Sequence, residues 1–281
     1  MEIIEAYLTR NPCYQANVRE VDSRYTAFQT EGPRGLMLHS VGCVQPKASV
    51  FLSGWDKPDY DRACVHAFID GKTGTVYQTL PWSFRGWHCG GPANETHVGV
   101  ELCESDAIRY LGANRFEIIN QKTALADCAR SYAAAVELFA FLCLRYDLDP
   151  RTAILSHKEG AAAGLASDHG DPEHYWSGLG TGHTMDGFRA DVAAAMTEIS
   201  PAAPDLGTGT EPSDPAEPGA AGEALPFPDV PAEAWYADAL RWAVEKRIVL
   251  PGDAPFRPDA PLTKAAAVVW LRRLWRSLGE P

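Results

Sequence analysis

The chain has 281 residues, and its 25 lysines and arginines against 37 aspartates and glutamates give a formal net charge of −12. This length accommodates one sizeable catalytic domain and a smaller module. The negative charge argues against nucleic acid as a partner, because phosphates require a basic face, and the apolar stretches are too short to span a membrane.

The opening residues lack the basic and apolar regions of a secretory signal. We therefore expect a protein that is made in the cytoplasm without a signal peptide and that needs another route to any extracellular target. The seven cysteines include no Cys-x-x-Cys pair. In a reducing compartment we expect them to be small buried apolar residues.

Residues 1–200 alternate strand-like and helix-like segments. Short apolar runs predict strands at 35–39, 64–70, 75–78, 97–103 and 153–156. A turn signal at 70–74 joins the second and third of these as a hairpin. The helical spacing of apolar residues predicts helices at 122–145 and 185–199. This pattern predicts an α/β domain with a mixed central sheet covered by helices.

Residues 201–225 change character, because proline, glycine, alanine and acid occur there without apolar periodicity. Such a composition predicts a flexible linker. Order is expected to resume in a small all-helical module over 226–281, with helices at about 233–246 and 263–277. The chain is thus predicted to have three parts, over 1–200, 201–225 and 226–281.

Two histidines in the first part each end an apolar run that reads as a buried strand. They are His39 and His157, and the loop after His157 closes on Asp171. Proteins of the α/β class place functional groups at the ends of such strands. Two imidazoles and one carboxylate fill three positions of a tetrahedral zinc site and leave the fourth for water. That pattern is typical of a hydrolytic rather than a structural site.

Five segments of residues 1–200 jointly resemble the amidase-2 type of N-acetylmuramoyl-L-alanine amidase, a superfamily that includes phage-lysozyme amidases and peptidoglycan recognition proteins. The segments are His39-Ser40, Val65-His66-Ala67-Phe68, Gly86-Trp87-His88-Cys89-Gly90, His97-Val98-Gly99-Val100-Glu101-Leu102, and 157–176. The resemblance implies the amidase-2 fold and a Zn2+ cofactor held by His39, His157 and Asp171. The loop before Asp171 is longer than in compact members, so His169 is the alternative third ligand. Both nitrogen and oxygen donors suit zinc, and the Asp171-Pro172 pair favours the carboxylate.

The same resemblance implies two catalytic residues. Glu101 matches the glutamate of the family's Gly-hydrophobic-Glu-Leu strand and would deprotonate the attacking water. His169 stands where relatives often carry lysine, and it would stabilise the oxyanion. Phage-type members carry a tyrosine where this chain has Val65, so the version of the mechanism that uses a glutamate fits better.

Other polar residues receive simpler interpretations. Trp87 and His88 lie in a glycine-rich turn and are candidate substrate-binding residues, with a scaffold role also open. We expect His66 to be a hydrogen-bonded core residue, and Glu104 to be solvated on the opposite face of a continuing strand. Three histidines are expected to be surface or outer groups around the site: His97, His174 and His183.

Residues 227–281 resemble one S-layer homology repeat, a module that holds proteins to secondary cell-wall polysaccharides. Trp235 and Lys264 are the candidate polymer-binding residues. The family's Thr-Arg-Ala-Glu motif reads here with Lys264 and Ala266, so the bidentate fork of arginine and the acid are lost. The alternative is a helical hairpin for self-association. A lone repeat leaves apolar faces uncovered, which predicts docking on its own domain or a homo-oligomer.

The sequence therefore predicts a zinc-dependent peptidoglycan hydrolase that cleaves the amide between N-acetylmuramic acid and the L-alanine of the stem peptide. A prophage endolysin that acts on the cell wall after release is favoured over a housekeeping autolysin. The expected partners are peptidoglycan and secondary cell-wall polysaccharide, without nucleic acid or membrane. Two alternatives come from other classes: a non-catalytic muropeptide-recognition protein and a structural S-layer-anchored wall protein.

Overall fold

The computed structural model describes residues 2–199 and, beyond them, residues 227, 230, 237–246, 248–249, 270 and 274. The chain divides into two compact units, Met1–Leu206 and Gly207–Pro281. The expected linker at 201–225 lies outside the described residues, as do Trp235 and Lys264. The predicted three-part boundaries therefore stay a prediction.

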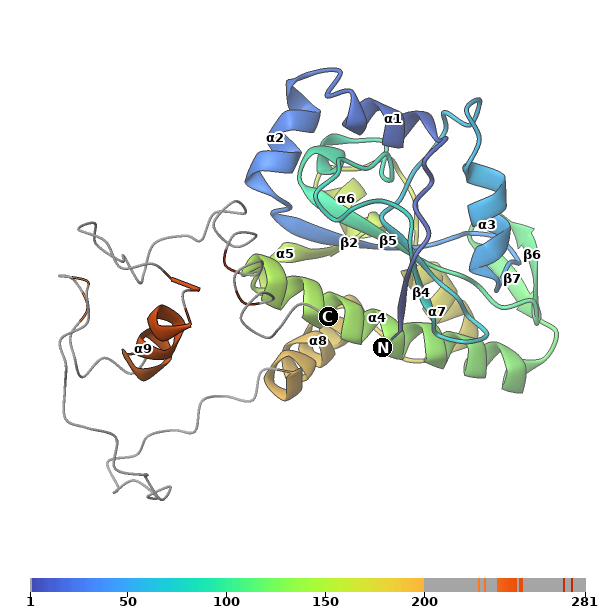
Figure 1. Ribbon diagram of the computed structural model, residues 1–281. Helices are drawn as coiled ribbons and strands as arrows, with labels where there is room; N and C mark the ends of the chain where they lie inside the picture. The colour runs from blue at the N-terminus through green and yellow to red at the C-terminus, as the bar shows by residue number, and fades with distance from the viewer. Residues whose placement is uncertain are drawn as a thin grey trace, which may run out of the picture. The chain divides into compact units, whose positions relative to one another are not determined.

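A six-stranded sheet forms the centre of the first unit (Figure 1). Its strand order is β1-β4-β3-β5-β2-β8, and all neighbours pair in parallel except β3 and β4. The strands are β1 Ile3–Glu5, β2 Gly35–Ser40, β3 Ala67–Ile69, β4 Val76–Gln78, β5 His97–Leu102 and β8 Ile154–Ser156. The mixed sheet and the antiparallel hairpin that the sequence predicts are both confirmed.

Helices surround this sheet, and the two long ones match the predicted helices. These are α4 Gln121–Tyr146 and α8 Met185–Ile199. Asn120 begins α4 by accepting a hydrogen bond from the backbone of Thr123, and Asp147 ends it in a left-handed conformation. Shorter elements were not expected: α1 Pro12–Val18, α2 Ser23–Glu31, α3 Ala48–Trp55, η1 Pro92–Glu95, α5 Pro150–Ala153, α6 His157–Ala162, α7 Glu173–Leu179, and the hairpin of β6 Ile108–Gly112 and β7 Arg115–Ile118.

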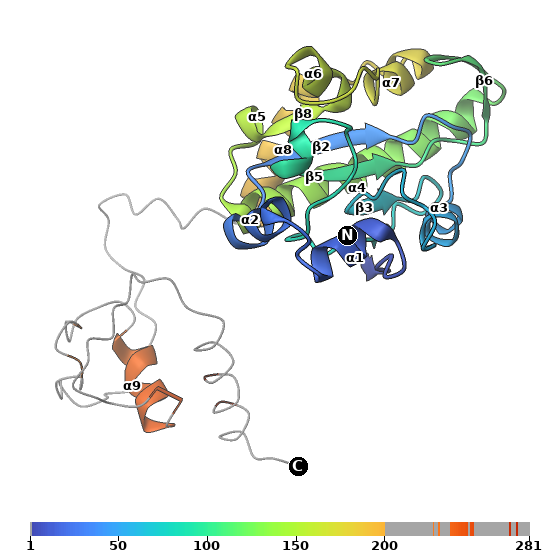
Figure 2. The same cartoon turned by 90° about the horizontal axis from the view of Figure 1, so that it is seen from above.

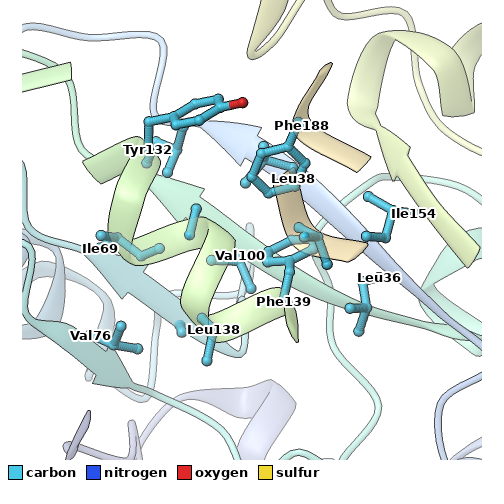
Figure 3. Close-up of a cluster of buried hydrophobic side chains, with 14 of the residues drawn as sticks. Leu36, Leu38, Ile69, Val76, Val100, Tyr132, Leu138, Phe139, Ile154 and Phe188 are labelled. Carbon is cyan, nitrogen blue, oxygen red and sulfur yellow. The ribbon is translucent and has the colours of Figure 1, made fainter. Parts of the chain in front are cut away.

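The main core lies between one face of the sheet and the helices α4 and α8. Leu36 and Leu38 of β2, with Val100 of β5, pack against Phe139 of α4 and Phe188 of α8 (Figure 3). All five side chains are fully buried. Because side chains alternate along a strand, the residues between them point to the opposite face, where α6 lies (Figure 1). That opposite face carries the polar groups described below.

The second unit contains α9 Ala237–Glu245, which falls within the predicted helix at 233–246. A small apolar cluster surrounds α9 and consists of Phe227, Val230, Ala237, Leu240 and Val249, with Ala243, Val244 and Trp270 packed against it. Of the predicted helix at 263–277, the structure describes Trp270 and Leu274 only. Within the described parts of both units, no helix has the length and hydropathy required to cross a bilayer.

Candidate metal centre and active site

Three neighbouring strands place polar groups side by side at their carboxyl ends. The strand β2 lies between β8 and β5, and it runs beside β5 in Figure 2. His39 of β2 is directly opposite Glu101 of β5. Leu38 is opposite Ser156 of β8, so His157 comes next, as the first residue of α6. Directly paired residues share one face of a sheet, which puts His39 and Glu101 together on the face opposite α4.

His39, His157 and Asp171 form a buried group whose ligand atoms all lie within 4.8 Å of one another. The Nδ1 atoms of the two histidines are 3.0 Å apart. The carboxylate of Asp171 is 3.4 Å from Nδ1 of His39 and 3.5 Å from Nδ1 of His157. A tetrahedral zinc with bonds of about 2.0–2.1 Å separates its ligands by about 3.4 Å. The spacing and the chemistry of this donor set therefore fit zinc.

The pKa shifts of His39 and Asp171 favour the forms that bind a metal. Burial lowers the pKa of His39, more than the neighbouring Asp171 raises it. Burial alone would raise the pKa of Asp171, but hydrogen bonding with His157 and the contact with His39 hold it far below its usual range. A neutral imidazole beside an ionised carboxylate is ready to bind a cation.

His169, the alternative third ligand, lies outside this group of three. Its ring centroid is 4.5 Å from that of His157, and its Nδ1 is 3.1 Å from the hydroxyl of Ser167. The side chain is exposed at the edge of the site. The geometry therefore favours Asp171 as the third donor and leaves His169 free to meet a substrate.

A cavity of about 570 Å³ opens onto the group, and its lining includes Glu101, Trp87, His88 and His169. The Oε2 atom of Glu101 is buried and has no hydrogen-bond partner among the described residues. Burial, with the nearby charges of Asp171 and Glu104, raises the pKa of Glu101 well above its ordinary value. A carboxyl group in the wall of this cavity, with one oxygen unpartnered, is suited to exchange a proton with a bound molecule.

Trp87 and His88 line the same cavity, but their polar atoms have partners within the protein. Trp87 donates its indole N–H to the hydroxyl of Tyr25 at 3.0 Å. The two ring nitrogens of His88 lie 2.9 Å from Nε2 of His39 and 3.0 Å from the carbonyl oxygen of His97. Substrate binding by Trp87 and His88 stays a prediction.

The expectation that Glu104 is solvated is wrong. The strand β5 ends at Leu102, so its alternation does not extend to residue 104, and the side chain of Glu104 is fully buried. Its Oε1 accepts a hydrogen bond from the backbone of Gly42 at 3.1 Å, and its Oε2 accepts one from the hydroxyl of Tyr110 at 2.6 Å. Tyr110 lies on β6, part of the hairpin that the sequence did not predict.

The core role predicted for His66 is confirmed. This ring is fully buried, with Nε2 2.7 Å from the carbonyl oxygen of Phe84, and Nδ1 accepts a hydrogen bond from the backbone of Gly99 at 3.0 Å. The three outer histidines contact groups next to the site or beyond it: His97 bonds Thr96, His174 bonds Tyr110 and His183 stacks on Tyr132.

The buried carboxyl of Glu104 predicts a pH-dependent stability. Burial raises its pKa from 4.5 to about 7, despite hydrogen bonds that act in the opposite direction. The folded chain then holds this proton more tightly than the unfolded chain does, so stability is lost as the pH rises from about 4.5 to about 7. Relative to Glu104→Gln, the free energy of unfolding of the wild type should fall by up to about 3 kcal/mol across this interval.

Urea denaturation of the wild type and of Glu104→Gln at several pH values measures this difference. Groups remote from Glu104 cancel when the two curves are subtracted. Glu101 does not cancel fully, because Glu104 contributes to its raised pKa, so the same comparison in a Glu101→Gln background isolates Glu104. Parallel curves between pH 4.5 and 7 would contradict the prediction.

Comparison with known protein families gives one match in each unit. Residues 29–174 match the family described as N-acetylmuramoyl-L-alanine amidase, and residues 226–268 match the S-layer homology domain. No curated protein matches the chain.

The fold is shared with a solved hydrolase structure, and other solved structures are also matched. The hydrolase AmiA of Staphylococcus aureus, crystallised with its ligand, is 19% identical and superposes with a TM-score of 0.54 over 73% of this chain and 88% of its own. The amidase LysC of Clostridium intestinale is 15% identical, with a TM-score of 0.34 over 64% of this chain and 98% of its own. Since the family match spans just over half of the chain, and the α/β fold agrees with it, the chain belongs to the N-acetylmuramoyl-L-alanine amidase family and carries one S-layer homology domain.

Proposed function

We propose that this protein is a zinc-dependent hydrolase that cleaves the amide bond between the lactyl group of N-acetylmuramic acid and the L-alanine of the stem peptide. One observation carries the proposal: the donor atoms of His39, His157 and Asp171 converge, and Glu101 lies opposite His39 on the neighbouring strand. Membership of the amidase family supports the choice of substrate.

His39, His157 and Asp171 would hold the zinc ion. When bound, zinc polarises the scissile carbonyl and makes water more acidic. The side chains around it account for the proton transfers. Glu101 takes a proton from the attacking water, and its raised pKa lets it keep that proton until the amine departs. Passing the proton to the amine nitrogen as the C–N bond breaks completes the hydrolysis.

His169 would stabilise the oxyanion in this mechanism. It is exposed at the edge of the cavity, close to His157. From there it can donate a hydrogen bond to the carbonyl oxygen of the substrate as negative charge develops.

The direct test incubates the full chain with purified peptidoglycan and measures which groups appear. An amidase releases new α-amino groups of alanine without new reducing sugar ends, and chelation followed by zinc addition should abolish and then restore that release. New reducing ends would indicate a glycosidase instead. Binding of muropeptide without any release would favour the non-catalytic recognition protein, the second candidate function.

We also propose that the S-layer homology domain associates the enzyme with secondary cell-wall polysaccharide. The family match at residues 226–268 supports this role. Trp235 and Lys264 remain the proposed binding residues. Retention of the full chain on walls stripped of this polysaccharide would argue against the proposal, since the catalytic domain alone would then account for wall binding.

The biological setting that we propose is a prophage endolysin, made in the cytoplasm and active on the wall after release. Expression inside a susceptible bacterium should then cause lysis only when a membrane pore is produced at the same time. Lysis without the pore would favour a protein that reaches the wall by its own export.

Self-association is a further prediction for the second unit. Repeats of this kind cover their apolar faces by packing on other repeats. One repeat is matched at residues 226–268, and Trp242 of α9 is 48% exposed. We expect light scattering to give the full chain a mass above that of a monomer, and a chain that ends at residue 200 the mass of a monomer. Monomers in both samples would rule out the oligomer.

A further inference from the structure

Each candidate ligand histidine presents one ring nitrogen to the metal group and the other to a protein atom. For His39, Nδ1 lies in the group and Nε2 is 2.9 Å from Nδ1 of His88. For His157, Nδ1 lies in the group and Nε2 is 3.2 Å from the hydroxyl of Ser167. The outer nitrogens matter because a neutral imidazole carries one proton, and the nitrogen that carries it cannot bind a metal.

The carbonyl oxygen of His97 fixes the direction of the hydrogen bonds around His88. Its Nε2 faces the carbonyl oxygen of His97 at 3.0 Å, and a carbonyl can only accept. Nε2 of His88 must therefore carry a proton. In the neutral ring Nδ1 is then bare, so it accepts a proton from Nε2 of His39. That arrangement leaves the lone pair on Nδ1 of His39 directed at His157 and Asp171.

We propose that His88 is a positioning residue that holds His39 in the Nε2–H tautomer, so that Nδ1 is ready for the metal. The purpose of this arrangement rests on the proposed zinc enzyme, but the tautomer is a property of the metal-free chain. Outer partners of this kind orient metal ligands and raise their affinity for the ion.

The surroundings of His88 hold its ring in place. A Cβ at Gly99 would lie 2.4 Å from Cγ of His88, so the ring packs on β5 only because residue 99 has no side chain. The backbone N–H of His88 donates to Oδ1 of Asn94 at 2.8 Å. The ring is only 9% exposed, and both its nitrogens are engaged.

Ser167 is the outer partner of the second ligand. Its hydroxyl lies 3.0 Å from the carbonyl oxygen of Cys89, 3.1 Å from Nδ1 of His169 and 3.2 Å from Nε2 of His157. Because a hydroxyl both donates and accepts, these contacts are compatible with either tautomer of His157. The chain at His88 and Cys89 therefore supports both ligands, one through a side chain and the other through a backbone carbonyl.

The tautomer of His39 can be read directly by ¹⁵N NMR of the metal-free full chain. We expect the wild type to show the Nε2–H form, whereas His88→Leu, which removes the acceptor and fills the space, should show a mixture of both forms. An Nδ1–H form in the wild type would overturn the proposal without recourse to any variant.

Zinc affinity, measured by competition with a chelator, provides the second readout. His88→Leu should bind zinc on the order of 10–100-fold more weakly. His88→Asn places an amide oxygen near the position of Nδ1 and should recover most of that affinity. His183→Gln, which removes a histidine that stacks on Tyr132, is the matched control and should bind zinc as the wild type does.

The outcomes separate this proposal from the proposed function. Wild-type affinity and an unchanged His39 tautomer in His88→Leu would overturn the role of His88, whatever the enzyme hydrolyses. A chain that binds no zinc would defeat the proposed function, while the NMR measurement would still decide the tautomer. If His88→Leu does not fold, the wild-type spectrum and His88→Asn supply the decision.

Discussion

His39→Ala and His157→Ala are each expected to lose bound zinc and hydrolytic activity together. Either change removes one of three converging donors and leaves the other buried imidazole and Asp171 without a cation between them. A metal ion contributes several kcal/mol of transition-state stabilisation, so a rate loss on the order of 10³-fold or more should follow. Metal content by mass spectrometry and release of alanine amino groups measure the two effects on the same samples.

The third ligand is decided by comparing Asp171→Ala with His169→Ala. The distances place Asp171 in the donor group, so Asp171→Ala should lose zinc. His169→Ala should keep zinc and lose rate, because its expected contact is with the substrate. The reverse result, full metal in Asp171→Ala and none in His169→Ala, would exchange the two assignments.

Glu101→Gln should fold, keep its zinc and lose on the order of 10²–10⁴ in rate, the usual contribution of a positioned general base. Glutamine is nearly the same size as glutamate but cannot accept a proton. Because the pKa of Glu101 is raised, the wild-type kcat/KM should also increase with pH as this carboxyl ionises, and that increase should be missing in the variant.

A matched control for this change is Glu31→Gln, which alters an exposed carboxylate at the end of α2. It should leave both the rate and its pH dependence unchanged. A rate in Glu101→Gln within about threefold of wild type would remove Glu101 from the mechanism, and a loss confined to KM would assign it to substrate binding.

The residues of the site could be predicted from sequence where a strand pattern carries them. His39 and His157 each end a run of buried residues, and parallel strands bring their carboxyl ends to the same edge. The family resemblance, and not the strand pattern, identifies Glu101. It also favours Asp171 over His169 as the third ligand, since nothing in that loop fixes where the chain returns.

The missed features depend on contacts between distant segments. The buried carboxylate of Glu104 accepts a hydrogen bond from Tyr110, and Tyr110 in turn lies 2.7 Å from Nε2 of His174, 64 residues later. The strand β1 has only three residues, Ile3–Glu5, too few for an alternating pattern to be recognised. The inward position of His88 depends on the missing side chain of Gly99.

The central place of β2 has a consequence for how the chain folds. His39 and His157 are 118 residues apart in sequence, yet their strands are neighbours. Closing so large a loop costs entropy before any contact compensates for it, and non-local pairing of parallel strands is slow. The pairing of β8 with β2 should therefore be among the last events in folding. Catalytic competence would then appear late, and a chain that stops before residue 157 should have no activity, because it lacks two of the three metal ligands and the part of the core that α8 supplies.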